Sequence, residues 1–409
     1  MSVEEQIGIE QIEAAQATID GAVGRTPALH LAAMDERCGG IVRLKAENLQ
    51  RTGSFKIRGA TNKLAALGKR AEAGVVTGSA GNHGQALAAA AERAGITCDL
   101  FVPSDGSVSK TEDARRHRAV IHTCEGSVDE CVAEARELAE KDGLNFVHPF
   151  DDPEIIAGQG TIGLELLEDI DDLAKVIIPL GGGGLASGIA IAVKSRRPEV
   201  EVIGVQVESC APFPESLDAG QPVAIAAAKT IADGIAVKRP GDSTLPLLKR
   251  WLDGVSTVTD DQVADAMGVL MADGKLVVEG AGAVGVAALL SGHESLAAEG
   301  TTAVILSGGN LDPSMLEAVA RRAVGSSGHA VVLSTRISDR PGSLAALLEV
   351  VAGTGASVVE VRHVREGIEL HIAETGVELI LETRGHDHTE SIVGALGERG
   401  YEVSKPWAL

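Results

Sequence analysis

The sequence predicts an α/β protein in which parallel strands are covered by helices on both faces, followed by a smaller βαββαβ module of the ferredoxin-like kind. Short apolar runs alternate with helical stretches from about residue 40 to about residue 320, as expected for parallel strands joined by helices. The 409 residues are 44% hydrophobic, which provides a sizeable core and excludes a disordered protein. After the Gly-Ser-Ser-Gly stretch at 325–328, the pattern becomes strand, helix, two strands, helix and strand.

The charge balance limits the classes of partner. The chain has 36 Lys and Arg against 58 Asp and Glu, a net charge of -22. Such a surface repels phosphate backbones and anionic lipid, and an aromatic content of 2% provides few stacking platforms for bases. Nucleic acid and membranes are therefore not expected partners. The acid excess with few lysines also predicts a salt-rich habitat.

The N-terminus and the cysteines indicate a cytoplasmic location. The first residues are acidic, without a basic segment followed by an apolar core, so no signal peptide is expected. No apolar run reaches the roughly 18 residues that a transmembrane helix needs. The five cysteines are scattered without a C-x-x-C pair, which predicts packing roles and neither a zinc site nor a disulfide framework.

The first polar motif, Glu47–Ala60, contains Lys56 between a polar turn and an apolar, helix-like stretch. An amine that forms a Schiff base must lose its proton, and burial or a nearby cation lowers its pKa. Lys56 is therefore a candidate for attaching an aldehyde cofactor. The alternative is an ordinary surface lysine.

The second motif, Ser79–Gln85, follows the apolar run Val75–Thr77 and precedes a helix that we expect from Gln85 to Ala94. Small residues let backbone N–H groups approach an anion, and the helix dipole adds positive potential. The segment suits a substrate carboxylate, although a simple strand-to-helix turn has the same composition. Asn82 can also donate to a phenolate-type oxygen.

Four consecutive glycines, Gly181–Gly184, follow the expected strand Val176–Leu180 and precede a helix from Leu185. One tight turn does not explain four glycines, whereas four glycines suit a nest of N–H donors around a phosphate. A dinucleotide-binding fingerprint is the alternative, but Ser187 occupies its third glycine position. The motif therefore favours a single phosphate.

The last motif of the α/β region, Ser307-Gly308-Gly309-Asn310, follows the expected strand Ala303–Leu306. Its serine offers a hydroxyl to a ring nitrogen, although the segment is also typical of a turn. An amine, a carboxylate loop, a phosphate nest and such a hydroxyl together match pyridoxal phosphate with a bound amino acid.

The C-terminal module begins after the expected linker. Its βαββαβ order contains no obvious nucleophile and base, so binding or regulation is its expected role. The expected elements are the strand Ala330–Arg336, the helix Leu344–Gly353, the strands Ser357–Val364 and Glu369–Leu381 with a turn near Glu374–Gly376, the helix Glu390–Arg399 and the strand Tyr401–Val403.

In the order and spacing of these motifs, the chain resembles the threonine dehydratases (threonine ammonia-lyases) of the tryptophan-synthase-β family of pyridoxal-phosphate enzymes. The resemblance covers the whole length and implies the two-subdomain fold type II followed by an ACT domain. The implied boundaries are a catalytic domain at 1–322 with a smaller subdomain inserted at about 48–147, a linker at 323–328 and the ACT domain at 329–409. A homodimer or homotetramer is also implied.

The resemblance assigns roles residue by residue. Lys56 would bind the cofactor and act as the base at Cα, Asn82 would hydrogen-bond the cofactor's 3-oxygen, and Ser307 would face its pyridine nitrogen. The main-chain N–H groups implied for the phosphate belong to Gly181, Gly182, Gly183, Gly184 and Leu185. Candidates for the substrate carboxylate are Ser79, Gly81 and His83, and Ser54 and Glu279 are expected near the site.

The implied reaction is α,β-elimination, which converts L-threonine to 2-oxobutanoate and ammonia, L-serine to pyruvate, and can open isoleucine biosynthesis. A neutral Ser307 favours prompt elimination, because it does not stabilise a protonated ring nitrogen. The first alternative is a serine or aspartate racemase or hydroxyaspartate dehydratase. The related racemases carry a serine where this chain has Ala80, and they hold a divalent ion with acidic residues that are missing after Glu208, so we expect no metal.

The second alternative is an amino-acid-binding regulatory protein with vestigial catalysis, which the intact motifs disfavour. The ACT resemblance implies an amino-acid effector, and isoleucine or valine is expected to shift activity. Whether or not it binds an effector, the loop that matches the ACT pattern is a Pro-Gly turn that begins a helix. The residues that match the effector loop are Asp339, Arg340, Pro341, Gly342 and Ser343.

Overall fold

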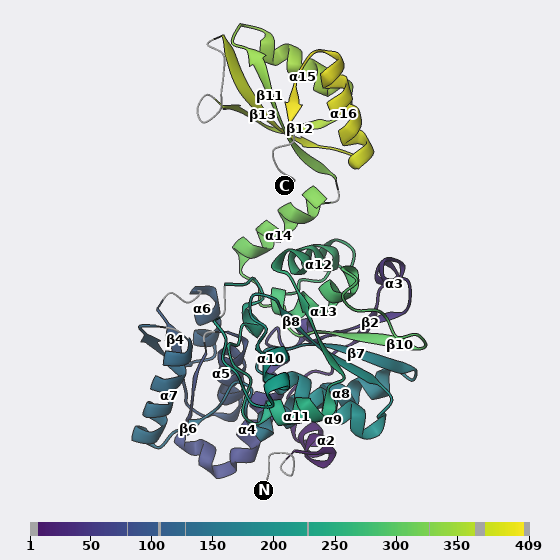
Figure 1. Ribbon diagram of the computed structural model, residues 1–409. Coiled ribbons are helices and arrows are strands. Elements are labelled where there is room, and N and C mark those ends of the chain that lie inside the picture. Colours follow the sequence, from purple (N-terminus) through teal and green to yellow (C-terminus); the bar gives the residue numbers. More distant parts are fainter. Residues whose placement is uncertain are drawn as a thin grey trace. The chain divides into compact units, whose positions relative to one another are not determined.

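The computed structural model describes residues 7–79, 81–104, 108–126, 128–226, 229–326, 328–364 and 373–404. The chain folds into two compact units, Met1–Asp312 and Pro313–Leu409, whose helices and strands are labelled in Figure 1. Within the described residues, no helix combines the length and the apolar composition needed to cross a membrane.

The first unit is built on a large sheet with the strand order β1-β2-β10-β7-β8-β9. Neighbouring strands are parallel except for β1 with β2, so the sheet has one antiparallel edge strand. The inner strands are almost entirely buried, as expected when helices cover both faces. The strands are β1 (Ala28–His30), β2 (Val42–Ala46), β7 (Leu173–Pro179), β8 (Glu201–Val207), β9 (Gly254–Val258) and β10 (Thr301–Leu306).

Helices lie on both faces of this sheet (Figure 1). Helices α2, α8, α9 and α11 lie on one face, whereas α12 and α13 lie on the other. Their bounds are α2 (Ile9–Ile19), α3 (Ala32–Cys38), α8 (Pro153–Asp169), α9 (Gly184–Arg196), α10 (Pro212–Ala219), α11 (Thr244–Trp251), α12 (Asp260–Ala272) and α13 (Gly280–Leu290). Short 3-10 helices span Glu47–Leu49 (η1), Gly68–Ala73 (η2) and Asp233–Ile235 (η3).

Glycines allow α8 and α9 to pack closely. A Cβ atom on Gly160 would lie 2.9 Å from the carbonyl oxygen of Gly188, and one on Gly188 would lie 2.4 Å from that of Ile156. Both helices are buried along most of their length. This contact therefore fixes the segment before α8 relative to the glycine segment before α9, and both segments belong to the site described below.

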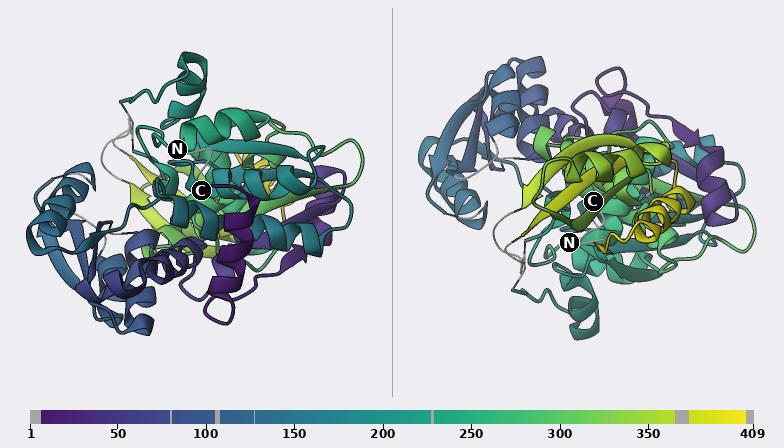
Figure 2. Two further views of the ribbon diagram at one scale, coloured as in Figure 1. Left: turned by 90° about the horizontal axis from the view of Figure 1, so that it is seen from below. Right: turned by 90° about the horizontal axis from the view of Figure 1, so that it is seen from above.

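The chain between β2 and α8 forms a second sheet, with all pairs parallel in the order β5-β4-β3-β6. Helices α4 and α5 pack on one face of this sheet and α7 on the other. Both views of Figure 2 show these elements, coloured blue, as a lobe beside the large sheet. The elements are α4 (Lys56–Leu67), β3 (Val75–Gly78), α5 (Asn82–Ala94), β4 (Cys98–Pro103), α6 (Val108–Arg116), β5 (Val120–Cys124), α7 (Val128–Asp142) and β6 (Asn145–Phe146).

The second unit contains the βαββαβ module that the sequence predicts. Its sheet has the order β12-β13-β11-β14 with antiparallel pairs, which is the ferredoxin-like arrangement. Apolar residues of both helices and of β11 and β13 form its core. The elements are α14 (Pro313–Ser326), β11 (Ala330–Ser338), α15 (Ser343–Gly353), β12 (Ser357–Val364), β13 (Glu374–Glu382), α16 (His386–Glu398) and β14 (Val403–Ser404).

Some boundaries differ from the sequence prediction. Helix α5 begins at Asn82 instead of Gln85. The predicted turn at Glu374–Gly376 is wrong, because these residues begin β13 and Gly376 pairs with Arg336 of β11. Pairing within the sheet has overridden the local turn tendency of glycine. The expected linker also starts inside a helix, since 323–326 are the end of α14, and the expected strand residues 369–372 lie outside the described part.

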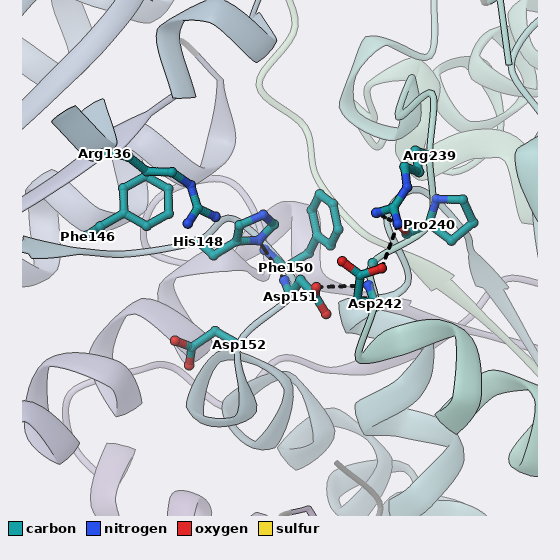
Figure 3. Close-up of a pocket in the computed structure, with 10 residues that line it drawn as sticks. Arg136, Phe146, His148, Phe150, Asp151, Asp152, Arg239, Pro240 and Asp242 are labelled. Carbon is teal, nitrogen blue, oxygen red and sulfur yellow. Dashed lines mark hydrogen bonds and ion pairs between the residues drawn. The ribbon is translucent and has the colours of Figure 1, made fainter. Parts of the chain in front are cut away.

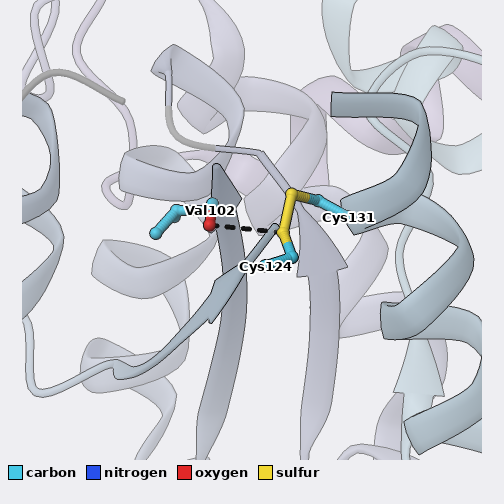
Figure 4. The surroundings of a disulfide bond; sticks show 3 residues. All are labelled: Val102, Cys124 and Cys131. Carbon is cyan, nitrogen blue, oxygen red and sulfur yellow. Dashed lines mark hydrogen bonds between the residues drawn. A yellow bond between two sulfur atoms is a disulfide. The ribbon is translucent and has the colours of Figure 1, made fainter. Parts of the chain in front are cut away.

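The expectation that the cysteines only pack, without a disulfide, is wrong for one pair. Cys124 at the end of β5 and Cys131 in α7 form a disulfide bond (Figure 4). Both residues are buried beneath the small sheet, and the Sγ atom of Cys124 lies 3.2 Å from the carbonyl oxygen of Val102. The spacing of seven residues did not predict this disulfide bond, because the geometry of the strand-to-helix turn decides whether the two side chains meet.

Candidate active site

The strands β3, β7 and β10 end in the polar and glycine-rich motifs, and the fold brings most of these motifs together. The N–H group of Phe55, beside Lys56, donates to the carbonyl oxygen of Ser307 at 3.1 Å. Ser54 and Gly308 form an isolated β-bridge. The lysine motif and the Ser307 motif are therefore neighbours, although about 250 residues separate them in the sequence.

Lys56 is the first residue of α4, and its amine has a neutral hydrogen-bond partner. The Nζ atom donates to the carbonyl oxygen of Pro149 at 2.7 Å and lies 5.1 Å from the centre of the Phe55 ring. Burial lowers the pKa of Lys56 to about 8, although the nearby carboxylate of Glu279 acts to raise it. About a tenth of this amine is therefore neutral and nucleophilic at pH 7, far more than for an ordinary lysine.

The Asn82 side chain lies in a hydrogen-bonded chain at the start of α5. Its Nδ2 atom donates to Glu279 Oε1 at 2.6 Å, and its Oδ1 atom accepts from Asn310 Nδ2 at 2.8 Å. The Asn310 Nδ2 atom also lies 2.8 Å from the carbonyl oxygen of Thr52 and from Gln85 Oε1, so its two N–H groups are shared among three acceptors. These bonds fix the orientation of the Asn82 amide, so that one N–H remains for another acceptor.

The sequence alone predicted no role for Asn310, which is the last residue of the Ser307 motif. The signal that was available is its amide side chain directly after a glycine pair at the end of a strand. Glu279, expected near the site, is there: it is buried, and its N–H group donates to the carbonyl oxygen of Gly308 at 3.0 Å.

The glycine segment between β7 and α9 is enclosed by side chains and leaves its amides free. A Cβ atom on Gly182 would lie 2.4–2.5 Å from atoms of the Phe150 ring, and one on Gly183, at φ +102°, would lie 2.7 Å from Thr244. Within the described residues, no hydrogen bond uses the N–H groups of Gly182, Gly183, Gly184 or Leu185. These donors lie at the start of a helix, which is the arrangement that binds a phosphate.

The candidate carboxylate segment turns tightly between β3 and α5. A Cβ atom on Gly84 would lie 2.2 Å from the carbonyl oxygen of Ser79, so only glycine fits there. The N–H group of Gly81 points towards Ser79 Oγ, at 3.4 Å. Ala80, the position that separates the racemase alternative, lies outside the described residues.

His83 is buried, and its side chain contacts the backbone just after β6 instead of solvent. Its Nε2 atom lies 3.3 Å from the carbonyl oxygen of Val147, and its Nδ1 atom has no hydrogen-bond partner among the described residues. Burial lowers the pKa of His83 to about 3, and the nearby Lys56 contributes to this lowering. The ring is therefore neutral at physiological pH.

A cavity of about 410 Å³ lies beside the glycine segment (Figure 3). Arg136, Phe146 and His148 line one side, whereas Arg239 and its ion-pair partner Asp242 face them. The cavity also adjoins the Phe150 ring that covers Gly182. Its lining is Arg136, Phe146, His148, Phe150, Asp151, Asp152, Arg239, Pro240, Gly241 and Asp242.

The segment Pro149–Phe150 contacts both Lys56 and the glycine segment. Its Pro149 carbonyl holds the amine, and its Phe150 ring covers Gly182. The Nδ1 atom of the neighbouring His148 accepts from the N–H group of Asp151 at 2.8 Å, and burial lowers the pKa of His148 to about 4. This neutral ring orders the turn that leads into α8.

The expected effector loop lies in the second unit. Asp339 follows β11, and its N–H group donates to the carbonyl oxygen of Ala373 at 2.8 Å. Gly342, at φ +93°, precedes Ser343, the first residue of α15. The loop is thus the expected turn into a helix, and no contact in the structure tests its effector role.

The residues of the first unit fit pyridoxal phosphate. Lys56 supplies an amine with a lowered pKa, and the glycine segment supplies unused N–H donors. The Oγ atom of Ser54, two residues before Lys56, is completely buried without a hydrogen-bond partner in the described part of the chain. No group of three or more His, Cys, Asp or Glu with metal-binding geometry occurs among the described residues.

Comparison with known proteins defines the class. The family model described as pyridoxal-phosphate dependent enzyme matches residues 19–308, and the chain belongs to this family. The prediction of the family and of its cofactor is therefore confirmed. The match ends before the second unit, so the ACT assignment stays a prediction.

Within this family, the chain is similar to two L-threonine ammonia-lyases. The protein of Thermotoga maritima is 44% identical over 400 residues, which cover 97% of this chain and 99% of the relative. The protein of Geobacter sulfurreducens is 40% identical over 382 residues, which cover 93% and 95%.

Solved structures show the same fold. The processed form of threonine deaminase isoform 2 from Solanum lycopersicum has a TM-score of 0.71 and 32% identity, covering 78% of this chain and 92% of that chain. Maize serine racemase has a TM-score of 0.72 and 34% identity, covering 76% and 96%. The α/β fold predicted from the sequence is therefore confirmed, and both deamination and racemisation occur on this scaffold by the names of these proteins.

Proposed function

We propose that this protein is a threonine ammonia-lyase, which converts L-threonine to 2-oxobutanoate and ammonia by α,β-elimination with pyridoxal phosphate. The observation that carries the proposal is the Lys56 amine, with a pKa lowered to about 8, beside the Asn82–Glu279 pair. The 44% identity to the Thermotoga maritima protein over almost the whole chain supports the substrate. L-serine would be a second substrate.

Different residues of the site would hold different parts of the cofactor. The unused N–H groups of Gly181–Leu185 would hold the cofactor phosphate, and the spare N–H of Asn82 would donate to the cofactor's 3-oxygen. Ser307 would face the ring nitrogen as a neutral partner. The bound cofactor supplies a conjugated ring that withdraws the charge left at Cα.

Lys56 would move the proton. The Lys56 amine would remove the Cα proton of the substrate, and the Pro149 carbonyl oxygen, 2.7 Å from Nζ, would hold that amine in place. The substrate carboxylate would lie against Ser79 and Gly81. A neutral His83 adds no charge beside the amine.

Other features of the function are proposals that rest on the sequence. The second unit would be an ACT domain, which binds isoleucine or valine through 339–343 and changes activity. Assembly as a homodimer or homotetramer, a role in isoleucine biosynthesis, a cytoplasmic location and tolerance of high salt also remain predictions.

The test is a product analysis of the purified full-length protein. We expect release of 2-oxobutanoate from L-threonine and of pyruvate from L-serine, an absorbance near 410–420 nm from the bound cofactor, and loss of both signals in Lys56→Ala. Formation of D-serine as the main product, resolved by chiral chromatography, would establish the racemase alternative. A colourless, inactive protein would favour the vestigial alternative. Adding isoleucine tests the effector.

A further inference from the structure

A buried network of charged side chains lies beside the first turn of α4. Arg58 is 1% exposed, and its neighbours Glu47 and Glu165 are also buried. The Nε and Nη2 atoms of Arg58 donate to the two oxygens of Glu47 at 2.8 Å each. Its Nη1 and Nη2 atoms donate to Glu165 at 2.7 and 3.0 Å, and Nη1 also donates to Thr161 Oγ1 at 3.1 Å.

All five N–H groups of the guanidinium are therefore used. A planar fork that grips two carboxylates at once is a task that lysine cannot perform. The second cation of the network, Lys45, lies 2.7 Å from Glu165 and 3.2 Å from Asp169, so it links Glu165 to a further carboxylate. A network in which every N–H of the guanidinium is bonded holds its members in one geometry.

This network joins the elements that carry both partners of the Lys56 hydrogen bond. Arg58 is in α4, whose first residue is Lys56. Glu165 is in α8, which begins four residues after Pro149, the acceptor of the Lys56 amine. The distance between the Lys56 amine and the Pro149 carbonyl thus depends on how α4 lies against α8.

Further contacts make the α4–α8 interface close. A Cβ atom on Gly158 would lie 2.6 Å from the Cα atom of Gly59, so the two backbones touch beside Arg58. The Asn62 side chain donates to the carbonyl oxygen of Glu154 at 2.8 Å. Lys63 pairs with Asp152, the N-cap of α8, at 2.5 Å. Unlike these contacts, the guanidinium of Arg58 also binds Glu47, which follows β2 of the large sheet directly.

We propose that Arg58 is a positioning residue, which sets the place of the Lys56 amine through the Arg58–Glu165 clamp between α4 and α8. The proposal deepens the proposed function and rests on it for the activity readouts. Displacing a catalytic amine by about 1 Å can cost a hundredfold in rate, so a loosened clamp should reduce turnover more than substrate binding.

The test compares Arg58→Lys with a matched control. Arg58→Lys keeps the positive charge but loses the fork. The control, Lys175→Met, breaks another buried ion pair of the first unit, since Lys175 is 3% exposed and lies 2.6 Å from Glu294. Lys175 is near the start of β7, away from α4. Both full-length variants are purified with the cofactor and compared with the natural sequence.

Three quantities are measured: kcat and KM for L-threonine, the pH midpoint of the absorbance change of the bound cofactor, and the melting temperature. For Arg58→Lys we expect kcat to fall by about tenfold or more while KM changes less than about threefold, with a displaced pH midpoint. For Lys175→Met we expect a comparable loss of melting temperature, an unchanged pH midpoint and a kcat within about twofold.

The proposal is overturned if Arg58→Lys keeps the kcat and pH midpoint of the natural sequence, or if both variants lose kcat in proportion to melting temperature. If Arg58→Lys does not fold, Thr161→Val removes a single bond of Arg58 and must give the same pattern at smaller size. If the natural protein lacks lyase activity, the proposed function fails, while the pH midpoint and the rate of cofactor rebinding to the cofactor-free chain still decide the role of Arg58.

Discussion

Two lysines of the first unit, Lys45, which is buried, and Lys56, which is half-buried, have opposite surroundings. Lys45 is completely buried, and its Nζ atom contacts the Thr26 carbonyl oxygen at 2.6 Å, Glu165 at 2.7 Å and Asp169 at 3.2 Å. The amine of Lys56 has a carbonyl acceptor at 2.7 Å and no ion pair within 4.0 Å among the described residues. The first environment supplies two carboxylates as ion-pair partners, whereas in the second burial lowers the pKa of Lys56 to about 8.

Burial alone does not make a lysine reactive. Lys45 is paired with carboxylates and serves the fold, whereas the Lys56 amine has a neutral carbonyl acceptor and a lowered pKa, which suit a nucleophile and a base. The two amines also belong to connected structures, because Glu165 contacts Lys45 and, through Arg58, the helix that begins with Lys56.

The largest effect is expected from Lys56→Ala. Without the amine, the site loses both the cofactor attachment and the base, so kcat/KM for L-threonine should fall by about a thousandfold or more. The absorbance of the attached cofactor should disappear, and the melting temperature should change little. The measurements are 2-oxoacid release and a visible spectrum. Substantial activity in this variant would assign the chemistry to another group.

Lys45→Met should act on stability instead. Removing this cation leaves Glu165 with less compensation in a buried place, and breaking a buried ion pair costs roughly 3–5 kcal/mol. Urea unfolding monitored by circular dichroism measures this loss, and the cofactor absorbance should persist in the folded variant. A Lys45→Met protein that is as stable as the natural one would contradict the structural role of Lys45.

The pH dependence of cofactor capture should report Lys56 directly. Because burial lowers the pKa of Lys56 to about 8, and only the neutral amine attacks an aldehyde, the capture rate of the cofactor-free chain should rise about tenfold per pH unit below 8. Above pH 8 the rate should level off. Stopped-flow absorbance measures the profile, and a rise that continues to pH 10 would mean that the amine is not buried.

The smallest effect is expected from Glu279→Gln. The carboxylate of Glu279 raises the pKa of Lys56, so its removal should move the midpoint of the capture profile to lower pH, by on the order of half a pH unit. Gln is a matched replacement because its amide oxygen can still accept from Asn82. A midpoint that moves upward would show that Glu279 does not act on Lys56 through its charge.

Much of the fold was predictable because its signals are local. Alternating apolar runs and helices indicated the parallel sheet: β7 overlaps the predicted strand Val176–Leu180, and β10 contains the predicted strand Ala303–Leu306. The module after α14 likewise has the predicted order of elements. The start of α5 at Asn82 and the strand pairing of Gly376 were missed, because helix caps and sheet partners are settled by packing that short sequence windows do not contain.

The sequence by itself determined the chemistry: an amine, a glycine-rich nest and a serine after a strand, in an order that identifies the family. Tertiary structure alone decided which groups meet. Asn310 reaches Asn82 across 228 positions, Arg58 reaches Glu165 across 107, and Phe150 covers Gly182. The physical reason is that hydrogen bonds and pKa shifts depend on distances of a few ångströms and on burial, which arise only when distant segments pack together.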